Sequence, residues 1–298
     1  MADSGRPRLV DGHVHYWDPA RLDWYQHLRP EVTIDYLGGD ISGMKLHYHH
    51  GTYQQDAAGW QVDGIVHVSA STNGRAYLAE TAWLTEIAAQ QSTPMVLTGA
   101  VDPTLSDTEM AADLDDQMRS PLMRGVRVLE GLDYESKQAS SLLGLLAERG
   151  LVFDLVTHPG EMAQAAAALA AFPEAVYVVE HTGWPWPARL DEPGYFALWQ
   201  EGMSTLAKAG ENVHCKLSGL PMTLHDIQAE QMRPWIEHCL EVFGPARCLI
   251  GSNFPVDRLF GSFDALMSAY ARLTDPLGAS AQQAVFADNA ARVYRIPS

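Results

Sequence analysis

The sequence has little positive charge, few cysteines and no long hydrophobic run. Its 298 residues carry 20 lysines and arginines against 37 aspartates and glutamates, a formal net charge of -17. A chain so acidic, without a run of Lys or Arg, does not attract a phosphate backbone, so we expect no nucleic-acid partner. A small-molecule substrate fits, even an anionic one, because a pocket can focus a few basic groups against the net charge.

The three cysteines are an odd number and lack CxxC spacing: Cys215, Cys239 and Cys248. This pattern argues against a disulfide framework and a thiolate zinc site, and it favours a reducing, cytoplasmic location. No window approaches the roughly 18 apolar residues of a membrane span, and no signal-peptide pattern opens the chain. We therefore expect no membrane partner, while a homo-oligomer stays open.

Short apolar runs recur along the chain. Hydrophobic residues make up 47% of it, enough for a large core. Eight runs are too short for helices and rich in Val, Ile and Leu, which is typical of strands buried on both faces of a parallel sheet. They cover residues 9–14, 62–70, 95–101, 123–129, 151–156, 175–180, 212–217 and 247–252.

Segments with helical periodicity separate these runs. In one of them Ala76, Ala79, Trp83 and Ile87 form a single stripe, with which we expect the helix to cover the sheet. The alternation predicts an α/β fold, a single (β/α)8 TIM barrel over residues 1–298 with a closing helix at about 280–293. An open doubly wound sheet is the alternative, but no GxGxxG motif opens the first helix.

Catalytic groups of such barrels lie at the carboxyl ends of the strands. The polar residues at those ends are His13, His15, His67, Ser69, Asp102, Arg124, Arg127, Asp154, His158, Glu180, His181, Lys216, Ser218, Ser252, Asn253 and Asp257. Because side chains in a strand alternate, His13 and His15 face the same way and could hold a divalent cation or a substrate oxyanion. Two core histidines bonded to backbone carbonyls are the alternative.

Further candidates follow other strands. His181 and His158 each come directly after an apolar run, whereas His67 lies within one and is expected to support the site. Arg127 lies nearer its strand's end than Arg124 and is expected to bind a substrate carboxylate; the alternative is a pair with a surface acid.

Lys216 could add a point charge to the substrate site after the seventh run. Trp17 belongs to an aromatic-rich loop that could rim a pocket for a small ring-shaped ligand.

Several strings, in this order, resemble the amidohydrolase superfamily, in particular its lactonase-like branch with 2-pyrone-4,6-dicarboxylate lactonase and the L-fucono- and L-rhamnono-lactone hydrolases. The strings are DGHVHYWDP (11–19), VHVSAS (66–71), RGVRVL (124–129), EHTGWP (180–185), VHCKLSG (213–219), GSNFPVD (251–257) and FADNAARVYRI (286–296). The resemblance covers nearly the whole chain. It implies a distorted (β/α)8 barrel with His13 and His15 as the strand-one pair and His181 as the strand-six histidine.

Members of this branch differ in their use of a metal. The resemblance therefore implies either one zinc-like divalent ion on His13, His15 and His181, or hydrolysis without a metal. The aspartate that the superfamily uses as general base after strand eight is replaced here by Asn253. A neutral amide cannot accept a proton from water but can orient it. The base is then expected to be His158 or Asp257.

The sequence thus predicts an enzyme, an amidohydrolase-type hydrolase that opens the ester of a small sugar lactone or carboxylated lactone by water attack. His13, His15 and His181 would polarise the ring carbonyl, directly or through an ion, while Arg127 and Lys216 anchor the substrate. Two alternatives stay open: a decarboxylase, lyase or lactone isomerase acting on a small carboxylic acid, and a degenerate barrel that binds a ligand without chemistry.

Overall fold

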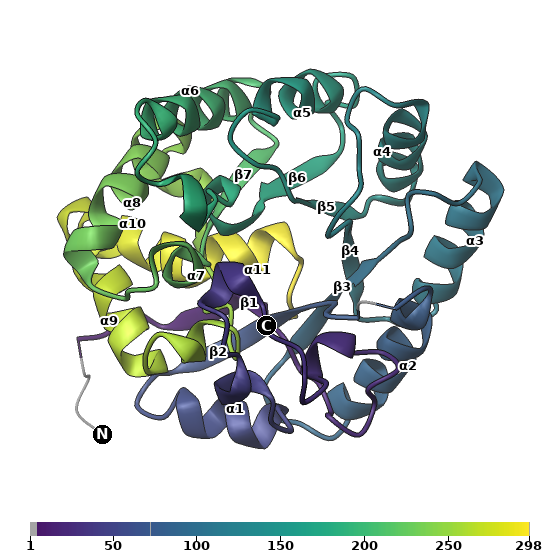
Figure 1. The fold of residues 1–298 in the computed structure, drawn as a ribbon, viewed down its shortest axis with the longest axis horizontal. Coiled ribbons are helices and arrows are strands. Elements are labelled where there is room, and N and C mark those ends of the chain that lie inside the picture. Colours follow the sequence, from purple (N-terminus) through teal and green to yellow (C-terminus); the bar gives the residue numbers. More distant parts are fainter. Residues whose placement is uncertain (1–4, 72, 298) are drawn as a thin grey trace.

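Eight parallel strands form the centre of the molecule. The computed structural model describes residues 5–71 and 73–297, and helices surround the central strands (Figure 1). The strands pair in sequence order, each parallel to the next. They are β1 (Leu9–Val14), β2 (Val62–Val68), β3 (Met95–Ala100), β4 (Met123–Arg127), β5 (Val152–Leu155), β6 (Val176–Val179), β7 (Val213–Leu217) and β8 (Cys248–Ile250). The predicted (β/α)8 barrel is confirmed.

Helices alternate with the strands and cover the outside of the barrel. No helix of the described residues is long and apolar enough to cross a membrane. The helices are α1 (His50–Asp56), α2 (Ala76–Ala88), α3 (Asp107–Gln117), α4 (Lys137–Arg149), α5 (Met162–Leu169), α6 (Tyr195–Lys208), α7 (Leu220–Leu224), α8 (Ala229–Phe243), α9 (Phe263–Thr274), α10 (Ala279–Gln283) and α11 (Asn289–Val293). The long loop after β1 holds single 3-10 turns at Gln26–Leu28, Asp35–Leu37 and Ser42–Met44.

The apolar stripe predicted on α2 is confirmed in part, because Trp83 and Ile87 are half-buried and pack against the core. Ala79 is exposed, and the buried residues of the helix are Tyr77, Glu80, Thr81 and Leu84. Glu80 accepts hydrogen bonds from the Ser69 hydroxyl and, at 3.1 Å, from the backbone N–H of Ala70. The face of this helix toward the barrel therefore carries a carboxylate that accepts hydrogen bonds from the loop after β2. A hydrophobic pattern cannot reveal such a buried polar residue.

Strands β8 and β1 close the barrel through a few specific bonds. The backbone N–H of Asn253 donates to the His13 carbonyl at 2.8 Å, and that of His15 donates to Phe254 at 2.9 Å. The Asp11 side chain accepts the N–H of Ser252 at 2.8 Å, in place of a ladder bond. Closure therefore fixes Asn253 directly against His13.

A cluster of valines fills one end of the barrel interior. Val10, Val66, Val96, Val152 and Val178 pack against residues of the C-terminal segment, which are Ala287, Ala290, Val293 and Tyr294. This segment runs through α10, a π-helical turn at Ala284–Asp288 and α11, close to the predicted helix at 280–293. The polar strand ends lie at the opposite end of the barrel.

Candidate active site

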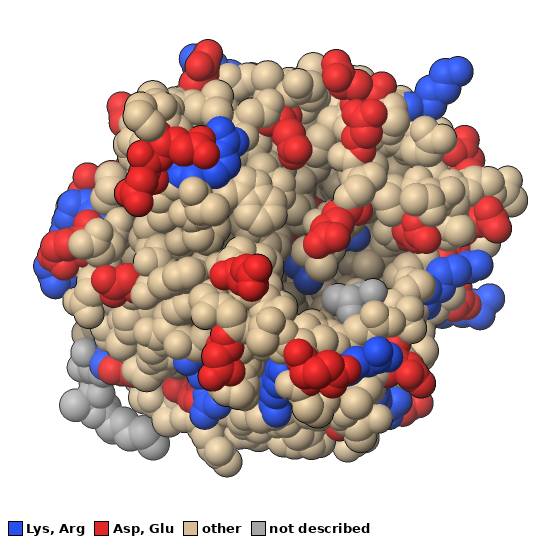
Figure 2. All heavy atoms as spheres, viewed as in Figure 1, with Lys and Arg blue, Asp and Glu red and all other residues tan. Residues whose placement is uncertain are grey.

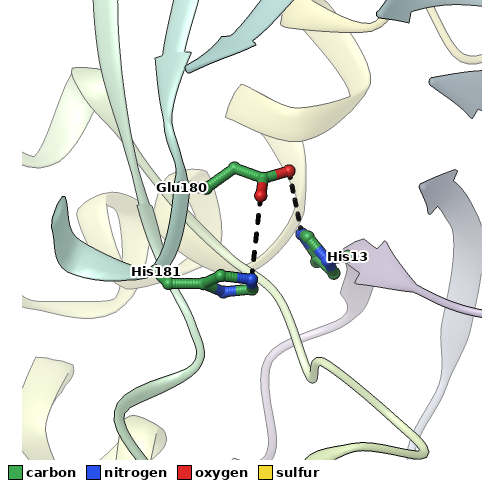
Figure 3. A group of neighbouring side chains, drawn as sticks. All are labelled: His13, Glu180 and His181. Atoms are coloured by element: carbon green, nitrogen blue, oxygen red, sulfur yellow. Dashed lines mark ion pairs between the residues drawn. The ribbon is translucent and has the colours of Figure 1, made fainter. Parts of the chain in front are cut away.

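Three fully buried side chains from β1 and the end of β6 lie at the centre of the site. One Glu180 oxygen is 3.6 Å from His13 Nδ1, and the other is 3.7 Å from His181 Nε2 (Figure 3). The His13 ring lies 4.4 Å from the His181 ring and 4.8 Å from the His15 ring, measured between centroids. The structure thus brings together the three predicted histidines and adds Glu180, for which no role was predicted from the sequence.

The backbone is strained where these residues lie. His181, Thr182 and Asn253 have φ of 52°, 52° and 56°, in the left-handed region that L residues rarely adopt. Each such residue costs on the order of 1–3 kcal/mol, and such residues concentrate at functional sites. Gly219 faces the His181 ring, and a Cβ at this glycine would lie 2.5 Å from that ring. The turn after β6 and this glycine together direct His181 into the barrel.

Arg127 is the basic residue of β4 that enters the barrel, as predicted. Its Nη1 lies 3.2 Å from Glu180 Oε2, and its Nη2 donates to the Ser69 carbonyl. Arg124 instead donates to the carbonyls of Pro121 and Met123 at 2.8 and 2.9 Å. Arg127 is thus paired with a buried carboxylate, and the alternative of a surface ion pair is wrong.

Lys216 is fully buried beneath the histidines. Its Nζ donates to Asp154 at 3.0 Å and lies 3.4 Å from His13 Nδ1 and 4.0 Å from Glu180 Oε1. The Tyr294 hydroxyl donates to the other oxygen of Asp154. Lys216 and Arg127 therefore offset the charges of two buried carboxylates, which leaves this network close to neutral.

The histidines are uncharged. Burial lowers the pKa of His13, His15 and His181 well below the usual range, and neighbouring cations lower it further. His15 Nδ1 lies 2.7 Å from the Val68 carbonyl, so we assign its proton to that nitrogen. His13 Nε2 must then donate to His15 Nε2, 3.1 Å away, which leaves His13 Nδ1 with its lone pair toward Glu180 and Lys216.

This group could hold a metal ion. Glu180 Oε1 is buried and has no hydrogen-bond partner among the described residues. Ligand atoms of His13, Glu180 and His181 lie within 4.8 Å of one another, and imidazole with carboxylate is a donor set that zinc accepts. The sequence predicted His15 in place of Glu180, and in the structure His15 lies beside the group, bonded to His13.

A pocket of about 300 Å³ opens above the group. Its floor carries the polar side chains of His15, Arg127, His181 and Asn253, and Trp17 lies in its wall, as predicted for an aromatic rim. In the view of Figure 2, acidic side chains are scattered over the surface, and a hollow near the middle shows a few basic atoms. The pocket thus gathers basic and polar groups that the negative net charge of the chain would not lead one to expect.

Two residues expected to contribute to the substrate site, His67 and Lys216, lie outside the pocket lining. His67 is buried, and its Nε2 lies 3.3 Å from the Tyr16 carbonyl; burial lowers its pKa to about 3. Its ring meets that of His15 edge to face at 6.4 Å, which fits the expected supporting role. Lys216 lies below the pocket floor and contacts His13 and Asp154.

The two candidate bases also lie outside the pocket lining. The ring of His158 stacks on Trp186 in a neighbouring cavity, and its Nδ1 lies 2.9 Å from the Trp184 carbonyl. Asp257 accepts a bond from the Asn253 amide at 2.9 Å, and burial raises its pKa well above the usual range. Trp184 and Asn253 thus stand between these residues and the pocket, so the geometry gives neither base role support.

Known proteins share this architecture. An L-fucono-1,5-lactonase from Burkholderia ambifaria is 29% identical over 298 residues, covering 96% of this chain and 95% of the relative. A crystal structure of an amidohydrolase from Burkholderia multivorans with bound zinc matches with a TM-score of 0.80 at 23% identity, over 97% of this chain and 100% of that one. The 5-carboxyvanillate decarboxylase of Sphingomonas paucimobilis matches with a TM-score of 0.67 at 15% identity, over 97% and 99%. The amidohydrolase family model matches residues 10–296, and the chain is therefore a member of this enzyme family.

Proposed function

We propose that the protein opens the ester of a small lactone by attack of water. The observation that carries this proposal is the group of His13, Glu180 and His181 beneath a pocket whose floor also holds Arg127 and Asn253. Lactone opening requires a base for the water and hydrogen-bond donors for the developing oxyanion. The neutral imidazoles and the guanidinium of this floor can supply both. The lactonase among the relatives supports this choice of reaction.

His181 is the proposed base. Its ring lines the pocket, and burial keeps it neutral, so that a ring nitrogen has a free lone pair for the proton of water. Ser218 Oγ, 2.9 Å from Nδ1, holds the ring so that Nε2 can take the proton of the attacking water. Glu180 lies 3.7 Å from that nitrogen and would stabilise the resulting imidazolium, which then gives the proton to the ring oxygen as the acyl C–O bond breaks. This assignment replaces His158 and Asp257.

Arg127 and Asn253 would position the reactants. The remaining N–H groups of Arg127 can donate to the lactone carbonyl, whose oxygen becomes negative during attack. The Asn253 NH2 group donates to Asp257 at 2.9 Å and contacts the Met222 sulfur at 3.7 Å. Its carbonyl oxygen is therefore left to accept a hydrogen bond from the attacking water.

A zinc-like ion is the proposed optional cofactor. His13, Glu180 and His181 would hold it, whereas the set predicted from sequence has His15 in place of Glu180. When bound, such an ion supplies Lewis acidity that polarises a carbonyl group. Arg127 and Lys216 already offset the buried carboxylates, so action without a metal, with His181 as base, is the alternative.

Proton release from a lactone panel tests the proposed function. The panel contains L-fucono-1,5-lactone, D-glucono-1,5-lactone and δ-valerolactone, and carbon dioxide release from 5-carboxyvanillate is followed in parallel. We expect at least one lactone to be hydrolysed and His181→Ala to lower kcat about 10²- to 10⁴-fold, the usual loss for a general base. The exposed His47, changed to Ala, is the matched control. Decarboxylation without lactone turnover would refute the proposal.

Metal content decides between the two routes. Elemental analysis of untagged protein, followed by assays after chelation, measures whether activity follows bound metal. Full activity of the metal-free protein supports His181 as base. Activity that vanishes with the metal and returns with zinc assigns His181 to the ligands instead.

A further inference from the structure

The walls of the pocket differ from its floor. Above the polar floor the lining comes mainly from the loops after β1, β4, β6, β7 and β8 and is largely apolar. Beside the rings of Trp17 and Trp184 it presents six aliphatic side chains, those of Ile34, Leu37, Met44, Leu129, Met222 and Val256. The polar groups of this part of the lining are few, namely His27, Glu130, the hydroxyl of Tyr36 and the indole N–H of Trp184. Burial lowers the pKa of His27 to about 4, so this ring is uncharged.

This lining is a poor match for a sugar lactone. Such a molecule carries hydroxyls on most of its ring carbons, and each hydroxyl that loses water needs a hydrogen-bond partner in the pocket. Of the two indole N–H groups in the lining, that of Trp17 donates to the Met44 carbonyl at 3.2 Å, and that of Trp184 has no partner among the described residues and could serve a single hydroxyl. An aliphatic wall instead favours a substrate that carries apolar carbon at the same level.

The charges of the site disfavour an anionic substrate. Among the described residues, Arg127 is the one Lys or Arg side chain in the pocket lining, and Glu180 already lies 3.2 Å from it. Lys216, below the floor, is paired with Asp154 at 3.0 Å. Glu130 adds an exposed carboxylate to the pocket lining, so a substrate carboxylate would meet repulsion and find no unpaired cation.

We propose that the substrate is a neutral lactone that carries a short alkyl or aryl substituent, and that the aliphatic wall binds this substituent. The inference rests on the proposed lactone hydrolysis and names the substrate class for the same site. The ester lies on the polar floor, within reach of His181 and Arg127, while the substituent points up along Leu129 and Val256. The pocket volume of about 300 Å³ is at the lower end for small-molecule sites, which limits the substituent to a few carbons.

A series of six-membered lactones tests the proposal. δ-Valerolactone, δ-hexalactone and δ-octalactone differ only in an alkyl group of zero, one or three carbons, and L-fucono-1,5-lactone and a carboxylated δ-lactone complete the set. We expect kcat/KM to rise about fourfold per buried methylene and to exceed that of L-fucono-1,5-lactone about tenfold for δ-octalactone. A flat alkyl series, or a preference for the sugar or the carboxylated lactone, would overturn the inference but leave the proposed function standing.

The case in which no lactone is hydrolysed refutes the proposed function, and binding then decides the inference by itself. The matched δ-lactams, δ-valerolactam and its 6-methyl and 6-propyl derivatives, resist hydrolysis and can be titrated by calorimetry. Tighter binding with each added carbon supports the aliphatic wall. Equal affinity across the lactams would overturn it.

Two variants locate the effect. Leu129→Gln places an amide on the wall and should remove most of the advantage of δ-octalactone over δ-valerolactone, which at fourfold per carbon is about 60-fold. Leu198→Gln on α6 is the matched control, because Leu198 is 37% exposed and lies outside the pocket lining. If Leu129→Gln fails to fold, as judged by circular dichroism, the nearly isosteric Val256→Thr replaces it. An unchanged alkyl preference in the folded variant would contradict the proposal.

Discussion

The two ends of the barrel interior share the same strands but have opposite chemistry. On β5, Val152 and Asp154 lie two residues apart and therefore face the same way; after β6, Glu180 follows Val178 by the same two residues, at the first position beyond the strand. The valines pack against the C-terminal segment, whereas the acids join the buried network of Lys216 and Arg127. Two positions along a strand thus separate the valine cluster, which forms an apolar plug at the closed end, from the charged residues of the site.

This contrast shows how the fold divides its tasks. Apolar burial at the closed end stabilises the barrel by roughly 25 cal/mol per Å² removed from water. Buried ion pairs contribute little net stability, because desolvation offsets their attraction. The closed end can therefore be expected to control stability and the open end to control chemistry.

The largest effect on stability is expected from removing one charge of the buried ionic network at the open end of the barrel. Lys216→Met leaves Asp154 and Glu180 without their ammonium partner, so the free energy of unfolding should fall by roughly 3–5 kcal/mol. Guanidinium titration measures this loss, and Lys137→Met at an exposed position of α4 serves as control. The double variant with Asp154→Asn should recover part of the loss. A loss below about 1 kcal/mol in the single variant would show that water reaches these charges.

Low pH should reduce the stability of the fold, because His214 is buried in its neutral form. Burial, reinforced by Arg292 and Arg247, lowers the pKa of this histidine from 6.5 to about 4. Below pH 6.5 the unfolded chain binds a proton that the native state resists, so stability falls as pH drops from 6.5 toward 4, by about 3 kcal/mol in full. His214→Gln should flatten this part of the curve of unfolding free energy against pH. Curves that stay parallel to wild type, as expected for the exposed His47→Gln, would contradict the prediction.

Truncation within the plug tests the division of tasks directly. Val178→Ala removes two methyl groups from a fully buried site and should lower the free energy of unfolding by roughly 2–3 kcal/mol. Because the site lies above it, kcat/KM on the preferred lactone should stay within about twofold of wild type. Glu180→Gln, two residues further on, should instead abolish most activity. Equal activity losses in both variants would contradict the view that the closed end controls stability and the open end controls chemistry.

The smallest effect is expected at Asn253, which orients without charge. Asn253→Ala should lower kcat about 10- to 100-fold, less than the loss of a general base. Asn253→Asp adds a carboxylate beside the histidines and should raise the zinc bound per chain. Elemental analysis and steady-state kinetics check the two results. No gain in zinc in the folded Asp variant would argue that this position lies too far from the metal group.

The sequence predicted the strands and the inward-facing site residues because both follow from a fixed period. Buried strands give unbroken apolar runs, and alternation along a strand decides which side chains share a face, as it did for His13 and His15. His158 and Asp257 lie in loops, which have no period, so their direction could not be predicted. Glu180 stood among the strand-end residues, but only the fold shows that it meets His13.

The closure of β8 on β1 also determines when the site can form. Ser252 is bonded to Asp11 across 241 positions of the chain, and Lys216 lies beside His13 across 203. Contacts of such long sequence separation carry a large loop-closure cost and slow folding. Partly folded chains with most helices in place would still lack the pairing that holds His13 against Asn253. During refolding, the recovery of activity should therefore lag behind the recovery of helical circular dichroism.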